Sequence, residues 1–502
     1  MSLRSFTLND QIERNAWLHG SQIAFICADQ RVTHAQYATR TARLAAGLAA
    51  SGVGVGERVA ILAHNCLEYV DLFGAAARLG AIVVPVNWRL SAEEVAYVLQ
   101  DTTPRVLIAA PDMHALVPEE VRKNMLSFTT GDSRTGTWQA LGELYLDAVT
   151  PPAVIDDDAG FVIIHTAAVG GRPRGALLSH HGLLSAAAKS QQAWNLTPVD
   201  VLLGVLPLFH LAGIGFTLAL LVAGGASIVL PRFDPKALVG LIDGHGGSVM
   251  GSFPPMLGSL LDAAAESGST LSKLRVVTGI DTPQTLERFS DACPNADFWV
   301  AYGQTETSGS VSLARFSDKP GSAGRPVAHH VVAIVDELDR PVPQDVTGEI
   351  VVRGPMVFLG YWNCDEDNAF TFRDGWHHTG DMGHLDSEGY LWYAGRSPAK
   401  ELIKPGGENV YPAEVERALL EHPDVLEAVV FGVPDAQWGE AVRAVCALKP
   451  GRALTADVLI EFVGQRIARY KKPKHVVFVA ALPRTAAGAI DRAAAKARHM
   501  EA

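Results

Sequence analysis

The sequence predicts an α/β protein with a large, multi-subdomain N-terminal domain and a small α+β C-terminal domain. Three observations support this: the length of 502 residues, an alternation of short apolar runs with helical patterns, and a change of pattern near residue 396. The length exceeds that of one average domain, so two or three domains are expected. The domains are expected to span residues 1–396 and 397–502, with two βαβ-type sheets and a small β-barrel in the first.

An early βαβ unit predicts the first sheet. Residues 58–63 have the pattern of a strand, residues 67–79 that of a helix with an alanine-rich face, and residues 81–86 that of a second strand. The second strand is a continuous apolar run, which is typical of a parallel strand buried on both faces. A parallel pair with a crossover helix is therefore expected here.

A similar alternation later in the chain predicts the second sheet. Strands are expected at residues 226–230, 247–251, 274–279 and 298–303, with helices at residues 234–242 and 255–265. In such sheets, ligands bind beyond the carboxyl ends of the strands. The motifs that end the last two strands are therefore candidate site residues.

The pattern then changes twice. Residues 331–354 contain short strands with Gly and Pro turns, which indicates the small barrel. The C-terminal domain is expected to contain a charged strand at 400–404, a helix at 412–420, strands at 425–432 and 441–448, and a helix at 457–468. Residues 397–399, Ser-Pro-Ala, form a plausible linker between the two domains.

One stretch has the length and the uncharged composition of a membrane-spanning segment. Residues 201–231 contain no Asp, Glu, Lys or Arg, and length alone would predict a transmembrane helix. Several Gly and Pro residues interrupt the stretch, so a loop, a buried helix and a buried strand at 226–230 are preferred.

Composition narrows the class of protein. The formal net charge of −12 disfavours a nucleic-acid partner, because such proteins usually carry a basic face. The five cysteines are scattered without metal-ligand spacing, which indicates reduced thiols in a cytoplasmic protein. The first 20 residues lack the apolar core of a signal peptide. The oligomeric state is left open, with a homodimer as one alternative.

The most informative segment is residues 395–416, GRSPAKELIKPGGENVYPAEVE. A Gly-Arg pair, a polar link, a charged strand, Gly-Gly, Glu-Asn and a helix-opening Tyr-Pro follow in order. This order resembles the hinge and active-site strip of the adenylate-forming superfamily, which includes acyl-CoA synthetases, luciferases and peptide-synthetase adenylation domains. The resemblance implies that ATP activates a carboxylate as its adenylate, which is then passed to a thiol.

The resemblance also implies roles within this strip. Arg396 would bind the ribose or a phosphate, and Lys400 would be the hinge. Gly406 and Gly407 would let the pantetheine arm of coenzyme A pass beside the backbone, because neither has a side chain. The C-terminal domain would be mobile, closing in one orientation for adenylation and rotating about the hinge for thioester formation.

Residues 161–180, FVIIHTAAVGGRPRGALLSH, have the pattern of a phosphate loop: a strand, glycines and a basic residue. The superfamily has T-S-G-T-T-G-x-P-K-G here. The chain retains Thr166 and Gly171, departs at residues 167–170, and has Arg174 in place of the usual lysine. The resemblance implies nucleotide binding by these three residues. A plain strand-to-helix turn is the alternative.

Two further motifs follow predicted strands. In YGQTE, at residues 302–306, Tyr302 is expected to stack on adenine, Thr305 to donate to the α-phosphate, and Glu306 to bind Mg²⁺. In TGIDTP, at residues 278–283, Gly279 is the one plainly retained residue of an adenine-binding loop. A polar turn and a plain loop are the respective alternatives.

Two motifs complete the expected site. Asp381 in WHHTGD is expected to accept hydrogen bonds from both ribose hydroxyls, the alternative being a solvated turn residue. His210 in PLFHLAG is expected to gate the acyl pocket, the alternative being a buried structural histidine. The segment GEIVVRGPMVFLGYW, at residues 348–362, also resembles the superfamily and is expected to be mainly structural.

The last motif departs from the superfamily at its catalytic position. Residues 469–492 are close to L-P-R-T-x-x-G-K-I-x-R, but Ala489 stands where the catalytic lysine is expected. Loss of one such charge-stabilising donor typically costs about 10²–10³ in rate. The apolar methyl group of alanine cannot replace it, so adenylation is expected to be weakened.

The sequence therefore predicts an ATP-, Mg²⁺- and CoA-dependent acid–CoA ligase. The uncharged stretch at residues 201–231 favours a fatty or hydrophobic acid, and an aryl acid is the near alternative. A non-catalytic homologue that binds nucleotide or acyl-CoA is the alternative of a different class, supported by Ala489 and by the depleted phosphate loop.

Overall fold

The computed structural model describes residues 3, 5–148, 150–166, 172–396, 402–484 and 490–500. The chain divides into two compact units. Unit 1 contains Met1–Trp88, Val98–His165 and Gly175–Gly395, and unit 2 contains Arg89–Tyr97, Thr166–Arg174 and Arg396–Ala502. Unit 2 thus includes two short segments from the first half of the chain, which no local pattern indicated. The expected boundary at residue 396 stays a prediction.

Two large sheets organise unit 1, as the sequence predicted. Among the described residues, nine strands form the first sheet, in the order β16 (Arg325–Pro326), β15 (Gly309–Arg315), β14 (Asp297–Gln304), β13 (Val276–Gly279), β12 (Val249–Ser252), β10 (Val201–Gly204), β11 (Ala226–Val229), β1 (Ile23–Cys27) and β2 (Gln30–Thr33). Strands β14, β13, β12, β10, β11 and β1 are parallel to their neighbours in this series.

The second large sheet contains the early βαβ unit. Its described strands run in the order β19 (Gly360–Tyr361), β9 (Arg174–Ser179), β8 (Gly160–Thr166), β4 (Ile82–Pro85), β3 (Arg58–Leu62), β5 (Val106–Ala109), β6 (Leu126–Thr129) and β7 (Gln139–Ala140). Helix α3 (Leu67–Leu79) connects β3 to the parallel β4. It ends at Gly80, which adopts the left-handed conformation that favours glycine.

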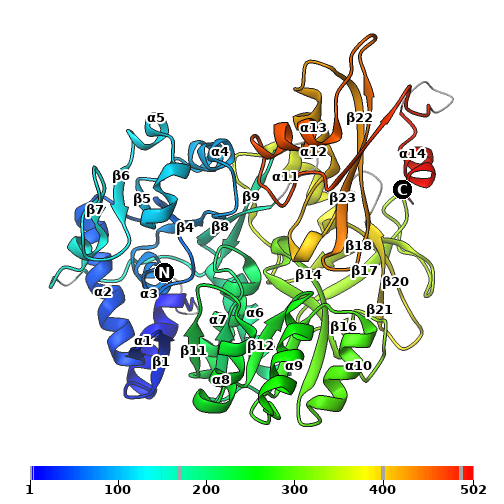
Figure 1. Cartoon of the computed structure of the whole chain (residues 1–502). Helices are drawn as coiled ribbons and strands as arrows, with labels where there is room; N and C mark the ends of the chain where they lie inside the picture. The colour runs from blue at the N-terminus through cyan, green and yellow to red at the C-terminus, as the bar shows by residue number, and fades with distance from the viewer. Residues whose placement is uncertain are drawn as a thin grey trace. The chain divides into compact units, whose positions relative to one another are not determined.

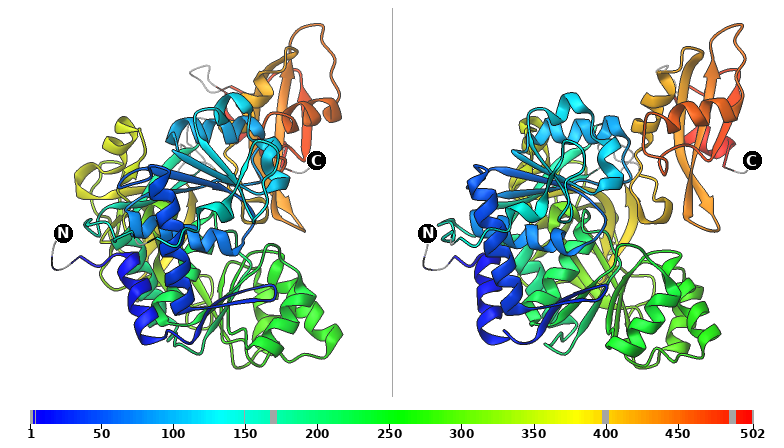
Figure 2. Two further views of the ribbon diagram at one scale, coloured as in Figure 1. Left: turned by 90° about the vertical axis from the view of Figure 1, so that its left-hand side faces the viewer. Right: turned by 60° about the vertical axis from the view of Figure 1, so that its left-hand side comes forward.

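Helices cover both faces of the nine-stranded sheet. Val249 of β12 packs with Leu220 of α7, whereas the next residue, Met250, packs with Leu257 of α9 on the opposite face. Figure 1 shows α8, α9 and α10 beside this sheet, and Figure 2 shows α1 and α2 side by side. Besides α3, the α-helices described in residues 1–396 are α1 (Leu8–Leu18), α2 (His34–Ala50), α4 (Ala92–Thr102), α5 (Glu119–Arg122), α6 (His180–Ala193), α7 (Leu211–Ala223), α8 (Pro235–His245), α9 (Met256–Ser267), α10 (Pro283–Ala292) and α11 (Asp365–Thr371).

The uncharged stretch folds as a loop, a buried helix and a strand. It supplies β10, helix α7 and β11, and α7 ends at Gly224 in the left-handed conformation. Within the described part of the chain, no helix is both long and apolar enough to cross a membrane.

The small piece around residues 331–354 was expected to be a β-barrel. The structure describes it as part of a four-stranded sheet with the order β17 (Val331–Val335), β18 (Gly348–Arg353), β20 (His377–Leu385) and β21 (Leu391–Arg396). Its pairs β17/β18 and β18/β20 are antiparallel. The register of β20 on β18 shifts between Glu349 and Val351, which marks a bulge in the strand that carries Asp381.

The C-terminal part of unit 2 is a small α+β fold. Its described strands are β22 (Val425–Asp435), β23 (Gly439–Leu448) and β24 (His475–Val479), and its helices are α12 (Pro412–Leu420), α13 (Ala456–Gly464) and α14 (Arg492–Arg498). β22 and β23 form a long antiparallel hairpin, and β24 pairs parallel to β23. Helix α12 begins at Pro412, where proline is pre-organised for the first helical turn.

Two predictions for this region were wrong in detail. The described residues of the expected strand at 400–404 make only an isolated bridge, between Ile403 and Val410. Pro405 follows, and proline cannot donate to a strand ladder. The helix predicted at 457–468 ends at Gly464, because glycine is a poor helix former.

A buried lysine connects distant segments of unit 2. Lys471 is 2% exposed, and its Nζ lies 2.5 Å from Glu94 Oε1 and 2.7 Å from Glu414 Oε1. Desolvation lowers the pKa of Lys471, but Tyr470 and the two carboxylates outweigh this and raise it above its ordinary value. The ammonium group therefore stays charged and holds two carboxylates that would otherwise repel each other.

Candidate active site

The Asp381 carboxylate is the centre of the candidate site in unit 1. Its Oδ2 accepts a hydrogen bond from the Tyr302 hydroxyl at 2.8 Å and one from Gln304 Nε2 at 2.5 Å. Gln304 Nε2 also donates to the Thr379 carbonyl at 3.0 Å. Asp381 is 2% exposed, so these bonds fix an acceptor group that is buried among polar partners.

The sheet topology explains this meeting of residues. Tyr302 and Gln304 end β14, which is parallel to β13, so both strands end at the same edge of the nine-stranded sheet. Asp381 comes from β20 of the small sheet, 79 positions after Tyr302. The ring of Tyr302 also lies 6.0 Å from that of Tyr393, at an interplanar angle of 31°. The structure thus brings two sequence-predicted residues together with two that were not predicted.

Gly279 ends β13 at the same edge. Its φ is +150°, and a Cβ added there would lie 1.8 Å from the Ser252 carbonyl oxygen. Only glycine is compatible with this close approach between β12 and β13. The packing of the strands therefore requires this glycine, whether or not it also contacts a ligand.

Glu306 follows β14 in a short 3₁₀ turn, Thr305–Thr307. Its Oε1 accepts a hydrogen bond from the Tyr361 hydroxyl at 2.8 Å, and its backbone carbonyl accepts from the Phe358 N–H at 2.9 Å. A carboxylate accepts several such contacts, and its hard oxygens suit Mg²⁺. Glu306 therefore fits the role of a magnesium ligand chemically.

His210 precedes α7 as its N-cap residue and lies in an aromatic group. Its ring centroid is 4.5 Å from that of Phe209, which lies 6.3 Å from Trp88, and Trp88 lies 4.5 Å from His64. The side chain of His210 is half-buried. Phe209 belongs to the same PLFHLAG motif, whereas the sequence did not indicate Trp88 and His64, which come from distant parts of the chain.

Asn65 fixes the backbone that leads to His210. Its Nδ2 donates to the Gly204 and Leu206 carbonyls at 3.3 and 2.9 Å, and its Oδ1 accepts from the Leu208 N–H at 2.8 Å. Nearby, Asn65, Leu206 and residues of α7 line a cavity of ≈ 10 Å³. This is room for about one water molecule. The apolar stretch thus supplies cavity walls, but this cavity is far smaller than an acyl chain.

The remaining described candidates lie in unit 2. Arg396 Nη1 donates to the Tyr411 hydroxyl at 2.9 Å. Thr166 ends β8 and Arg174 begins β9, with 3.5 Å between Thr166 Oγ1 and the Arg174 carbonyl oxygen. Both lie in one short segment of the unit, Thr166–Arg174.

Gly406 has a structural requirement of its own. Its φ is +58°, and an added Cβ would lie 2.8 Å from the Trp438 ring. Its N–H donates to the Trp438 carbonyl at 3.0 Å. Gly407 follows in the same turn, Pro405–Gly407. Three other candidates, Gly171, Lys400 and Ala489, lie outside the residues that the structure describes.

Three contacting residues were missed by sequence reasoning. Gln304 occupies the variable position of the YGQTE motif, so the motif itself gave no reason to select it. Tyr361 lies in the segment at 348–362 that was expected to be structural, and Asn65 lies in no motif. The partners named above are 55 to 143 positions away in sequence, so only the folded chain reveals them.

The fold and the site together define a class. A large α/β unit carries Tyr302 and Glu306 at the end of β14 and Asp381 within β20, and a separate α+β piece carries the Gly406 turn. The fold, a large α/β unit and a small α+β piece, is the one that the resemblance to adenylate-forming enzymes implied.

Comparison with known proteins agrees. The model of the AMP-binding enzyme family matches residues 12–362, and the model of the AMP-binding enzyme C-terminal domain matches residues 414–489. The chain belongs to this family, and it is an acyl-CoA synthetase that uses ATP and CoA as substrates.

Individual relatives differ in the acid named. Indoleacetate–CoA ligase of Aromatoleum aromaticum is 37% identical over 97% of this chain and 96% of its own. A long-chain-fatty-acid–CoA ligase of Mycobacterium tuberculosis is 34% identical over 92% of both chains. A solved structure of a double variant of o-succinylbenzoate–CoA synthetase from Bacillus subtilis matches 97% of this chain and 98% of its own, with 28% identity and a TM-score of 0.85.

Proposed function

We propose that this acid–CoA ligase acts on a hydrophobic carboxylic acid and that Asp381 anchors the nucleotide. The observation that carries the proposal is the buried Asp381 carboxylate, which Tyr302 and Gln304 hold at the edge where β13 and β14 end. Oδ2 already accepts two hydrogen bonds, from Tyr302 and Gln304, so the proposal places both ribose hydroxyls on Oδ1, which has two lone pairs.

The groups around Asp381 have distinct proposed roles in adenylation. The ring of Tyr302 lies beside adenine, near Gly279, while its hydroxyl orients Asp381. Thr305 donates to the α-phosphate, and Glu306 holds Mg²⁺, which would neutralise phosphate charge when bound. Thr305 and Glu306 begin the short 3₁₀ turn that follows β14, at the end of the strand that carries Tyr302.

Residues of unit 2 have proposed roles on the phosphate side and in the thiol step. Thr166, Gly171 and Arg174 contact the phosphates, and Arg396 contacts the ribose or a phosphate. The second step uses the turn that contains Gly406 and Gly407, beside which the pantetheine arm passes. The domain boundary at residue 396 and a rotation about Lys400 belong to the same proposal.

Ala489 is expected to slow the first half-reaction, adenylation, but not the second, thioester formation. Adenylation needs positive charge where the carboxylate attacks the α-phosphate, and alanine supplies none, so this step is expected to be about 10²–10³ slower than with lysine. Thiol attack on a preformed acyl-adenylate relies on the Gly406 turn instead. Thioester formation from supplied acyl-adenylate is therefore expected to proceed.

The acid is proposed to be fatty, because the stretch at residues 201–231, which forms β10, α7 and β11, contains no charged side chain. An aryl acid is the second candidate, favoured by the rings of Trp88, Phe209 and His210 at the start of α7. Such rings present flat faces that stack on an aromatic acid. A cytoplasmic location and a homodimer are further parts of the proposal.

The test separates the half-reactions. Pyrophosphate release and acyl-CoA formation are measured for the chain and for Ala489→Lys with dodecanoate, indole-3-acetate and ferulate. We expect Ala489→Lys to raise pyrophosphate release about 10²–10³-fold and to leave thioester formation from supplied acyl-adenylate unchanged. The preferred acid is the one with the highest kcat/KM.

Two outcomes would contradict the proposal. Pyrophosphate release by the unchanged chain at the rate of Ala489→Lys would show that a lysine at this position is not needed. Failure of both chains to convert supplied acyl-adenylate to acyl-CoA would instead favour a homologue that binds nucleotide or acyl-CoA without catalysis.

A further inference from the structure

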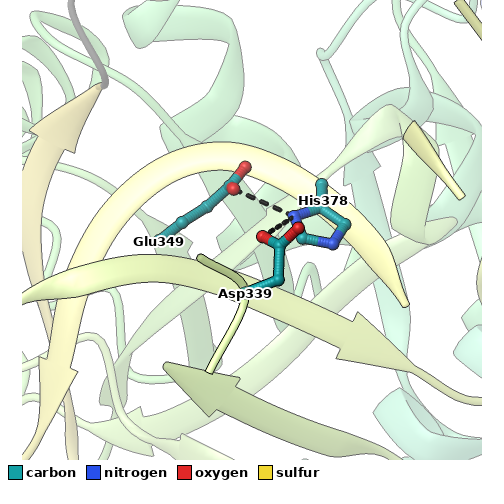
Figure 3. Close-up of side chains that lie close together, drawn as sticks. All are labelled: Asp339, Glu349 and His378. Atoms are coloured by element: carbon teal, nitrogen blue, oxygen red, sulfur yellow. Dashed lines mark hydrogen bonds and ion pairs between the residues drawn. The ribbon is translucent and has the colours of Figure 1, made fainter. Parts of the chain in front are cut away.

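A group of charged side chains includes one residue of β20, the strand that carries Asp381. His378 Nδ1 lies 2.9 Å from Glu349 Oε2 and 3.8 Å from Asp339 Oδ1, as Figure 3 shows. The three come from β20, β18 and the loop after β17. His378 is 1% exposed, whereas the side chains of Asp339 and Glu349 are 23% and 21% exposed, so this group of Asp339, Glu349 and His378 is only partly buried.

This group resembles a metal site, but Arg373 already balances the negative charge of its two carboxylates. One atom of each of its three side chains lies within 4.8 Å of the others, which is close enough to hold an ion. However, the Arg373 guanidinium donates to Asp339 Oδ2 at 2.9 Å, to Asp339 Oδ1 at 3.1 Å and to Glu349 Oε2 at 3.2 Å. A fixed guanidinium supplies the positive charge that a metal would supply. We therefore assign no metal to it.

Glu349 connects this charged group to the backbone next to Asp381. Its Oε1 accepts a hydrogen bond from the Gly380 N–H at 2.8 Å. Gly380 has a φ of +69°, in the left-handed region that favours glycine. The backbone immediately before Asp381 is therefore held by a side chain from the neighbouring strand.

This contact lies at the bulge in β20. Glu349 pairs with Met382, and Val351 pairs with His378. Residues 379–381 of β20 therefore lie opposite one residue of β18, Ile350. Bulges re-aim side chains and often lie beside active sites. Inside this bulge the Gly380 N–H bonds to a carboxylate, and the Thr379 hydroxyl donates to the Ile350 carbonyl at 2.6 Å.

The charge of Glu349 is secured by its partners. Burial alone would raise its pKa, but the hydrogen bonds from His378 and from the Gly380 N–H, with the charges of His378 and Arg373, hold the pKa below its ordinary value. The carboxylate is thus anionic and accepts on both oxygens, with Oε2 bound by His378 and Arg373 and Oε1 by Gly380.

We propose that Glu349 is a positioning residue for nucleotide binding, which acts by holding the bulge that aims Asp381 at the ribose. Arg373, Asp339 and His378 hold Glu349 in turn. This inference rests on the proposed role of Asp381 as the ribose ligand. It adds a residue that touches no substrate yet sets the affinity for ATP.

The test measures ATP binding by calorimetry in the full chain, so it does not depend on the rate of adenylation. Glu349→Ala should weaken ATP binding about ten-fold, and Glu349→Gln, which keeps an acceptor for Gly380, by no more than about three-fold. Arg373→Met should give an intermediate loss. Glu337→Ala is the matched control, because it removes an exposed carboxylate from the loop between β17 and β18, the strand that carries Glu349.

A second ligand separates positioning from general damage. ATP and 2′,3′-dideoxy-ATP differ only in the two ribose hydroxyls, so the ratio of their affinities reports on the ribose contact. The unchanged chain should prefer ATP, and Glu349→Ala should lose most of that preference while binding dideoxy-ATP nearly as well as before. If Glu349→Ala does not fold, Arg373→Met provides the same comparison, while Glu349→Gln, which keeps the acceptor for Gly380, should retain most of the preference.

The outcomes distinguish two failures. If the unchanged chain binds ATP and dideoxy-ATP equally, Asp381 is not a ribose ligand and the proposed function is wrong at that residue. If the unchanged chain prefers ATP and folded Glu349→Ala and Arg373→Met keep that preference in full, the positioning role of Glu349 is wrong while the role of Asp381 stands.

Discussion

Replacement of His180 should remove a defined part of the pH dependence of folding. His180 is the first residue of α6 and is 1% exposed. Its Nδ1 accepts a hydrogen bond from the Leu8 N–H at 3.4 Å, and its ring lies 4.8 Å from that of Phe161. Burial lowers its pKa from 6.5 to about 4, against the opposing charges of Asp10 and Asp157. The folded protein therefore keeps this ring neutral.

The sign and size of the effect follow from proton linkage. Between pH 6.5 and about 4 the unfolded chain binds a proton at this position and the folded chain does not, so acid favours unfolding. The stabilisation is complete above pH 6.5 and is lost as the pH falls toward 4. With these two pKa values, the loss between pH 7.5 and pH 5 is about 2 kcal/mol.

The assay is urea unfolding of the full chain at pH 7.5 and pH 5, with two variants. His180→Phe keeps an aromatic ring, although a larger one, and removes the acceptor for Leu8, whereas His180→Asn keeps an acceptor and leaves a small cavity. The two variants should lower the free energy of unfolding at pH 7.5 by different amounts. Between pH 7.5 and pH 5, however, the free energy of unfolding of each variant should fall by about 2 kcal/mol less than that of the unchanged chain. If both variants keep the pH dependence of the unchanged chain, His180 does not titrate as its burial implies.

Two further predictions concern buried polar groups. Lys471→Met should lower the stability of unit 2 by about 3 kcal/mol in thermal unfolding, because Glu94 and Glu414 would then face each other without a cation. Lys474→Met removes an exposed lysine as the control and should cost less than about 1 kcal/mol; equal losses would contradict the first prediction. Asn65→Leu should cost about 3 kcal/mol and lower kcat/KM for the acid, because three backbone groups before α7 lose their partner. An unchanged kcat/KM would show that this backbone does not shape the acid site.

Elements with strong local signals were predicted closely. The helix expected at residues 67–79 is α3 with the same bounds, because its apolar pattern ends at a glycine that caps it. The helix expected at 412–420 is α12, again with the same bounds, because Pro412 fixes its first turn. The strand expected at 400–404 was wrong, because charge alternation alone does not secure a partner strand.

The candidate site was only partly accessible to sequence reasoning. Ordered motifs selected Tyr302, Glu306 and Asp381 as members of one site. They did not reveal which atoms meet, because the bonds from Tyr302 to Asp381 and from Tyr361 to Glu306 join positions 79 and 55 residues apart. A motif records which residues are required, whereas a hydrogen bond depends on where two separate strands end.

By itself, the sequence determined the α/β class, the two large sheets, the family and the absence of a lysine at position 489. These follow from local periodicity, capping residues and ordered motifs, all of which act over a few residues. Tertiary structure alone decided that Gln304 and Tyr302 share the Asp381 carboxylate, and that Glu349 holds the Gly380 N–H. Such contacts depend on strand register and on a bulge, which long-range packing sets and no short stretch of sequence specifies.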